Sequence, residues 1–182
     1  MEVDLESFGN FSDKEVALLK NELVNRTLDK GEFLLKEGEI NRALVFVVRG
    51  SLYQFGVSAA NEPQYIDLYT SGDWMLNHQS FTTQEPSEYA IQAFEKSDIL
   101  ELTVEALHKL IGISQTFFQL GKILERGASR MRFFDKSYSP DEKYLYLLNH
   151  HPSYIRTFPQ KMIASYLKIT PETLSRVRKR LA

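Results

Sequence analysis

Near the carboxyl end of the chain, polar and cationic side chains recur at a helical spacing that suits contact with nucleic acid. Segment 171–181 has an apolar stripe of Leu174, Val177 and Leu181 at positions i, i+3 and i+7. Its other faces carry carboxylate, hydroxyl and cationic groups: Glu172, Thr173, Ser175, Arg176, Lys179 and Arg180. A short helix held by such a stripe can present these groups to base edges in the major groove of DNA.

Two further elements must position that helix. Ile163, Ala164 and Leu167 share one apolar face and predict a preceding short helix. Thr170 offers a side-chain oxygen that can cap the second helix, and Pro171 suits its first position. The small Ala164 lies where two helices must cross closely. The pattern predicts a helix-turn-helix, and a basic amphipathic hairpin without DNA contact is the alternative.

The charge distribution separates this region from the rest of the chain. The net charge is only −2, yet residues 140–182 hold eight basic and three acidic side chains, against 14 basic and 21 acidic in the preceding 139 residues. A small basic part beside a larger acidic part is typical of a two-domain nucleic-acid-binding protein. A solvated basic surface would give the same count, so the charge alone leaves both interpretations open.

Residue types suited to catalysis or metal binding are scarce. The absence of Cys excludes disulfides, thiol catalysis and Cys-ligated clusters. Only His78 of the four histidines falls among the predicted strands, so a cluster of His ligands is not expected. No Gly-x-Ser-x-Gly, phosphate loop or Gly-x-Gly-x-x-Gly occurs. We expect no enzymatic activity, no metal site and no bound cofactor.

Targeting signals are also lacking in the sequence. Met1–Asp13 is acidic, unlike a signal peptide, and no run of about 18 apolar residues could span a membrane. We therefore expect a cytoplasmic protein with no membrane partner.

Ahead of the basic region, short apolar runs alternate with turn signals. The predicted strands are 44–48, 52–57, 64–69, 89–94 and 99–102. A helix at 12–25, which begins with the capping box Ser12-Asp13-Lys14-Glu15, and a short helix at 103–111 flank them. This arrangement predicts an α+β protein whose first domain, 1–112, is a jelly roll (a double-stranded β-helix) with flanking helices.

The next segment has apolar residues at heptad spacing. They are Ile113, Phe117, Leu120, Leu124, Gly127, Met131 and Phe134. Such a seam predicts a long helix that pairs with a second copy of the chain, within a dimerisation and linker segment at 113–138. A long helix packed on its own domain is the alternative. Ser139-Pro140-Asp141-Glu142 then signals a new helix start and opens a C-terminal helical domain at 139–182.

The order of these elements resembles the CRP/FNR family of bacterial transcription regulators. The terminal segments Ile163–Leu167 and Thr170–Arg176 add sequence detail to that resemblance. The resemblance implies a jelly roll of the cyclic-nucleotide-binding type, a homodimer formed by the long helix, and double-stranded DNA as partner. RNA polymerase and a small-molecule effector are further candidate partners.

The family's base-contacting positions fall on Glu172, Ser175 and Arg176, and an arginine can pair with guanine O6 and N7. Lys168 stands in the turn where the family usually has Gly, so we expect it to be left-handed and able to reach a phosphate. The candidate DNA-binding residues are Lys168, Thr170, Glu172, Thr173, Ser175, Arg176, Lys179 and Arg180.

The nucleotide cassette departs from the family pattern. Gly72-Asp73 takes the place of the family's Gly-Glu pair, Ser87 replaces its phosphate-binding arginine, and Glu88 follows. A carboxylate beside a phosphate is repulsive, so we expect no binding of cyclic AMP. A pocket for another small molecule would be lined by Gly72, Asp73, Trp74, His78, Ser87, Glu88, Tyr89 and Gln92.

The sequence thus favours a homodimeric, sequence-specific DNA-binding transcription regulator that does not respond to cyclic AMP. The alternative is a small-molecule-sensing or protein-interaction module with a vestigial DNA-binding motif. The lack of a predicted β-hairpin wing before Ala182 favours that alternative.

Overall fold

The computed structural model describes residues 9–58, 61–125 and 138–181. The strands are β1 (Val24–Leu28), β2 (Phe33–Leu35), β3 (Ala43–Arg49), β4 (Ser51–Val57), β5 (Pro63–Thr70), β6 (Trp74–Met75), β7 (Ala90–Ala93) and β8 (Ser97–Thr103). The helices are α1 (Asp13–Glu22), α2 (His78–Thr83), α3 (Val104–Ile113), the 3₁₀ helix η1 (Gln115–Leu120), α5 (Pro140–His150), α6 (Pro152–Thr157), α7 (Gln160–Tyr166) and α8 (Pro171–Leu181).

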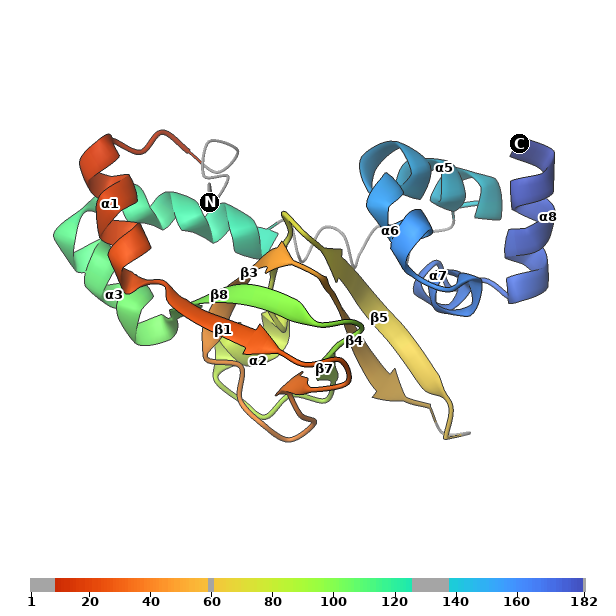
Figure 1. The fold of residues 1–182 in the computed structure, drawn as a ribbon, viewed down its shortest axis with the longest axis horizontal. Helices are drawn as coiled ribbons and strands as arrows, with labels where there is room; N and C mark the ends of the chain where they lie inside the picture. Colours follow the sequence, from red (N-terminus) through yellow and green to blue (C-terminus); the bar gives the residue numbers. More distant parts are fainter. Residues whose placement is uncertain (1–8, 59–60, 126–137, 182) are drawn as a thin grey trace.

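The strands form two antiparallel sheets that face each other. One has the order β1-β8-β3-β6 and the other β2-β7-β4-β5. Figure 1 shows α1 and α3 on one side of this sandwich and the helical domain α5–α8 on the opposite side, next to β5. The predicted α+β jelly roll with flanking helices and a C-terminal helical region is confirmed.

Strand alternation divides the buried side chains into three clusters. Between the sheets lie residues such as Val45, Tyr69 and Ile99. On the outer face of the β1-β8-β3-β6 sheet, Phe46 and Leu100 pack against α1, α3 and η1. The third cluster joins the helical domain to the outer face of the other sheet. The sandwich is therefore covered on both sides, once by its own helices and once by the second domain.

Both predicted capping boxes are present. Ser12 Oγ accepts from Glu15 N at 3.4 Å, and Glu15 Oε2 accepts from Ser12 N at 2.8 Å. At α5, Ser139 and Glu142 repeat the arrangement, with Glu142 Oε2 accepting from Ser139 N at 2.8 Å. These interactions satisfy N–H groups that have no partner inside a helix.

The predicted long helix is wrong at its beginning. α3 ends at Ile113, and Ser114 is extended (φ −147°, ψ 128°) before η1 begins. Phe117 and Leu120, predicted for the dimer seam, are 0% and 1% exposed and pack in the core of their own chain. The heptad spacing there reflects intrachain packing. Leu124 packs partly on the same core, while Gly127, Met131 and Phe134 lie outside the described residues.

Several short elements were not predicted individually. They are β1, β2, β6, α2 and α6, each of six residues or fewer. Such segments are too short to show a periodicity, and long-range pairing fixes them. In the described part of the chain, none of the helices has the length and apolar character needed to cross a membrane.

Candidate nucleic-acid interface

The turn between α7 and α8 has the geometry expected of a helix-turn-helix. Lys168 has φ +54°, so the predicted left-handed backbone is confirmed. Lys168 N donates to Ser165 O at 2.9 Å, and Ile169 N donates to Ala164 O at 3.0 Å. These two bonds make a Schellman motif, which ends α7 and redirects the chain. A side chain with a Cβ costs about 1–2 kcal/mol in this backbone region, where Gly has no such penalty.

The start of α8 is also as predicted. Thr170 Oγ1 accepts from Thr173 N at 3.2 Å and donates to Thr173 Oγ1 at 3.1 Å. The hydroxyl groups of both threonines therefore serve the cap. Leu174 and Val177 are buried, but Leu181 is 38% exposed, so the apolar stripe is shorter than predicted. α8 is thus anchored through its first two turns.

The outward face of α8 carries the remaining predicted DNA-binding groups. Glu172, Ser175, Arg176, Lys179 and Arg180 are all exposed. Arg176 Nη2 donates to Thr173 Oγ1 at 3.3 Å, which aims the guanidinium toward the N-terminal end of the helix. In a recognition helix that end meets the base edges. Arg180, in contrast, is ion-paired with Asp141 in the first turn of α5, which assigns it to the α5–α8 contact.

A buried lysine that the sequence reasoning missed supports the turn. Lys143 on α5 is 7% exposed, and its Nζ donates to Leu167 O at 3.1 Å, at the carboxyl end of α7. A cation is favoured there because the last carbonyl groups of a helix have no partner within it. In the sequence, Lys143 directly follows the Ser139–Glu142 capping box, and nothing at that position indicated its contact with Leu167.

The helical domain docks on the sandwich through α6 and α7, and α8 faces away from the strands (Figure 1). Ser165 Oγ accepts from Tyr65 N at 3.1 Å, and the Ser153 and Thr70 hydroxyls are 3.0 Å apart. Tyr154 OH donates to Asp73 Oδ2 at 3.0 Å. The docking leaves the polar face of α8 open to a partner.

Aromatic rings complete this contact. Phe94 lies against Phe158, with ring centroids 5.2 Å apart, and Tyr53 meets Tyr65 edge to face at 5.5 Å. Burial raises the pKa of both tyrosines, with the charge of Tyr65 adding to the effect on Tyr53. Their hydroxyl groups therefore stay protonated at neutral pH.

The predicted effector-pocket residues do not come together. Trp74 packs against Phe46 on the outer face of one sheet, whereas Gln92 is on the outer face of the other and donates to Gly31 O at 2.6 Å. The two cannot line one pocket, and Glu88 is exposed. The remaining members are dispersed: Gly72 in the turn after β5, Asp73 bonded to Tyr154, half-buried His78 at the start of α2, Ser87 in the loop after α2, and Tyr89 against Gly56.

The side chain beside Ser87 is Asn77, which the sequence reasoning did not select. Asn77 Nδ2 donates to Ser87 Oγ at 2.8 Å, and Ser87 Oγ donates to Tyr89 O at 2.7 Å. Asn77 N donates to Asn41 Oδ1 at 2.5 Å. These buried groups satisfy one another, so the Ser87 loop is held closed by its own hydrogen bonds. Among the residues described, no group of three or more His, Cys, Asp or Glu is arranged to hold a metal ion.

Comparisons with known proteins agree with this architecture. Residues 25–114 match the model of the cyclic nucleotide-binding domain. No protein with a curated description matches the sequence. The catabolite activator protein of Thermus thermophilus is 19% identical, with a TM-score of 0.61 over 96% of this chain and 85% of that one.

Two further solved structures are similar at the same level. FixK2 of Bradyrhizobium japonicum is 18% identical, with a TM-score of 0.65 over 87% of this chain and 84% of that one. A protein of Eubacterium rectale, described as a transcriptional regulator of the CRP/FNR family, is 16% identical, with a TM-score of 0.63 over 94% of this chain and 83% of that one. Residues 25–114 are therefore a cyclic nucleotide-binding-type domain, and the whole chain has the fold of the CRP/FNR transcription regulators.

Proposed function

We propose that this chain is a sequence-specific DNA-binding transcription regulator that acts as a homodimer, with one α8 helix in each half-site. The observation that carries the proposal is the α8 surface. Exposed Glu172, Ser175, Arg176 and Lys179 project from a helix fixed by the Schellman turn, the Thr170 cap and two buried side chains. A rigid helix with a polar face suits insertion into the major groove.

The test is selection of bound sequences from a random DNA pool by the full chain. An inverted repeat with half-sites about 10 base pairs apart supports both DNA reading and two-fold symmetry. A pool that shows no enrichment contradicts the proposal and favours a sensing or protein-interaction module with a vestigial motif.

Two variants divide the roles on α8. Arg176→Ala should weaken the free energy of DNA binding by about 1–3 kcal/mol and relax the sequence preference at one base pair, because a bidentate contact with guanine is lost. Lys179→Ala should weaken binding to all DNA sequences alike, because a phosphate contact is lost. The slope of log affinity against log salt concentration should become shallower by about 1. Arg49→Ala is the control, since Arg49 pairs with Asp98 on the sandwich at 2.8 Å and is exposed. Equal effects of the two α8 variants on specificity would contradict these roles.

The dimer is proposed through the end of α3 and the segment that follows. Within this part, Ile113 is 54% exposed and is an apolar side chain of the predicted seam, whereas Phe117 and Leu120 are occupied in their own core. Ile113→Glu should convert a sedimenting dimer to monomers and reduce DNA affinity. Val57→Glu is the matched control, because Val57 is 56% exposed on β4. A monomeric wild-type chain would refute the dimer while leaving the α8 test intact.

Cyclic AMP should not stabilise the protein. Ser87, which stands at the position of the family's phosphate-binding arginine, is engaged by Asn77, and the adjacent Glu88 adds a carboxylate that repels a phosphate. A ligand present at 100 times its Kd would add about 2.7 kcal/mol to the stability. A clear upward shift of the melting temperature in millimolar cyclic AMP would refute this part of the proposal.

A further inference from the structure

A cavity of about 230 Å³ lies between the two sheets. Most of its lining is apolar, and the buried side chains of Leu35, Val45, Met75 and Ile91 belong to the inter-sheet core. Since an apolar cavity of about 150 Å³ takes up benzene, a cavity of this size can accept about nine non-hydrogen atoms. None of the residues of the predicted effector pocket lines it.

The polar residues at the cavity wall are Asn41, Arg42, Glu101 and Thr103. Asn41 is buried, its Nδ2 donates to Ala43 O at 2.7 Å, and its Oδ1 accepts from Asn77 N at 2.5 Å. Thr103 Oγ1 accepts from Ala106 N at 3.1 Å and caps α3. The side chains of Asn41 and Thr103 therefore have their partners within the fold.

The side chain of Arg42 points away from the cavity. Ala43 packs on the inter-sheet core and Leu44 on the outer cluster, so strand alternation places Arg42 on the outer side with Leu44. The pKa of Glu105 on α3 is lowered mainly by hydrogen bonds from its own N–H and from Thr103, and the charge of exposed Arg42 adds to this effect. Arg42 therefore supplies no cation to the cavity.

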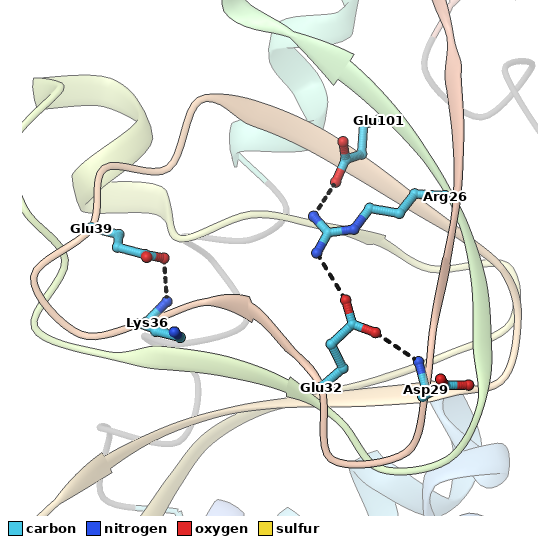
Figure 2. Close-up of polar contacts among 6 residues, drawn as sticks. All are labelled: Arg26, Asp29, Glu32, Lys36, Glu39 and Glu101. Atoms are coloured by element: carbon cyan, nitrogen blue, oxygen red, sulfur yellow. Dashed lines mark hydrogen bonds and ion pairs between the residues drawn. The ribbon is translucent and has the colours of Figure 1, made fainter.

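Glu101, in contrast, has its side chain on the inner face of β8. Ile99, two positions earlier, is in the inter-sheet core, and the partner of Glu101 on β3 is Val45, which lines the cavity. Arg26 Nη1 is 3.3 Å from Glu101 Oε1, and Figure 2 shows the other oxygen of Glu101 on the side away from Arg26. No hydrogen bond or ion pair among the described residues uses Glu101 Oε2. This oxygen is thus an available acceptor at the cavity.

The charges around Glu101 do not cancel. Arg26 Nη2 is 3.2 Å from Glu32 Oε1, so one guanidinium is shared by two carboxylates, which leaves a net charge of −1 (Figure 2). Hydrogen bonds from Asp29 N–H and from Arg26 lower the pKa of Glu32, which is therefore ionised at neutral pH. The Glu101 side chain is 21% exposed, so a cation at its free oxygen keeps part of its hydration while an attached apolar chain is buried.

We propose that this cavity binds a primary aliphatic amine of about the size of hexylamine. The ammonium group pairs with Glu101 Oε2, and the alkyl chain enters the apolar space between the sheets. The ammonium group completes an alternation of charge that runs from Glu32 through Arg26 to Glu101. A carboxylate ligand would be repelled by Glu101, and an alcohol would leave the negative charge unbalanced. The proposal does not depend on DNA binding.

The experiment titrates the full chain by calorimetry and thermal melting with hexylamine, 1-hexanol, hexanoate and ethylamine at millimolar concentration. Hexylamine should bind and raise the melting temperature. The alcohol and the acid should bind at least about tenfold more weakly, because each lacks the ammonium group. Ethylamine should bind at least about a hundredfold more weakly, because most of the alkyl chain is lost.

Each probe has an outcome that contradicts the proposal. Equal binding of the alcohol or the acid would overturn the pairing of an ammonium group with Glu101. Equal binding of ethylamine would overturn the burial of the alkyl chain in the cavity, and absence of hexylamine binding would overturn the site.

Two variants separate the polar contact from the apolar one. Glu101→Gln should weaken hexylamine binding about tenfold and leave 1-hexanol binding unchanged, because only the charge is removed. Ala43→Leu should weaken the binding of both about tenfold, because the larger side chain fills part of the cavity. Glu105→Gln is the matched control and should bind hexylamine as the wild type does, because Glu105 is exposed in the first turn of α3.

The two variants also guard against a loss of fold. Glu101→Gln removes a partner of Arg26, whereas Ala43→Leu leaves the ion pairs in place, and melting of each variant without ligand shows whether it is folded. Unchanged hexylamine affinity in either folded variant would overturn the proposal. An equal loss in Glu105→Gln and Glu101→Gln would do the same, because it would show a general attraction of amines to an acidic surface.

Discussion

On the outer face of the β1-β8-β3-β6 sheet, α1, α3 and η1 form an almost wholly apolar contact, whereas the contact of the other sheet with the helical domain adds tyrosines and hydroxyl groups to its apolar cluster. Phe46, Leu100 and Phe117 represent the first contact. Tyr65–Ser165 and Tyr154–Asp73 represent the second. Removal of the first cover would expose a continuous apolar surface to water, while in the second the hydrogen-bonding groups can exchange their partners for water and only the apolar cluster cannot. The first contact is therefore part of the domain core, and the second combines a buried apolar cluster with a polar interface.

The largest expected effect lies in the apolar contact. Phe117→Ala should lower the free energy of unfolding by about 3–5 kcal/mol, because a fully buried ring is replaced by a cavity. Its neighbour Phe118 is 64% exposed, so Phe118→Ala should change stability by less than about 0.5 kcal/mol. Urea denaturation of the full chain measures both. Similar values for the two variants would mean that the η1 register differs from the one described.

Substitutions at the contact between the sandwich and the helical domain should change the free energy of unfolding less. A double-mutant cycle of Tyr154→Phe and Asp73→Asn should give a coupling energy of about 1.5–3 kcal/mol, the range for a hydrogen bond to a charged group. Urea unfolding of the wild type, the two single variants and the double variant gives the four free energies that the cycle needs. Strict additivity would show that the two side chains do not interact in solution and would remove one link between the domains.

The helical domain also stores backbone strain, at Lys168 (φ +54°) in the turn between α7 and α8. Lys168→Gly should raise the free energy of unfolding by less than the full ~1–2 kcal/mol of the left-handed penalty, because Gly also loosens the unfolded chain. DNA affinity should fall without a change in the preferred sequence if Lys168 reaches a phosphate. Thermal melts and binding isotherms of one variant test both effects. A less stable variant would contradict the strain.

The smallest effect is visible only in acid, at the junction of α1 and η1. Hydrogen bonds from Ser114, then Ser12 and Thr116, lower the pKa of Glu15 from 4.5 to about 2. Since the folded pKa is below the unfolded one, the stabilisation is complete above about pH 4.5 and is lost as the pH falls toward 2. The stability difference between wild type and Glu15→Gln, followed by urea unfolding, should shrink across that range. A constant difference would show that Glu15 does not titrate with a lowered pKa.

Local signals in the sequence predicted local structure well. The Ser12 and Ser139 capping boxes, the Thr170 cap and the left-handed Lys168 are present as expected. Each depends on hydrogen bonds or steric contacts between residues a few positions apart. The alternation of apolar residues in the longer strands was equally informative, since successive side chains of a strand point either to the core between the sheets or to the helices that cover the outer face.

Predictions that required distant residues to meet were less successful. The heptad spacing of Phe117 and Leu120 correctly marked a buried face, but a spacing does not say which partner buries it. The candidate pocket residues Trp74 and Gln92 proved to be on opposite outer faces. One residue of offset in a strand reverses the direction of a side chain, so a pocket cannot be assigned before the register is known.

The sequence by itself thus determined the caps, the helix-turn-helix, the strand pattern and the basic surface of α8, because each arises within one turn or one strand. Only the tertiary structure decided that Lys143 supports the turn, that Arg180 is held by Asp141, and that Tyr154 meets Asp73. These pairs are 24, 39 and 81 positions apart in the chain. Their meeting depends on how strands pair and helices dock, which no local pattern contains.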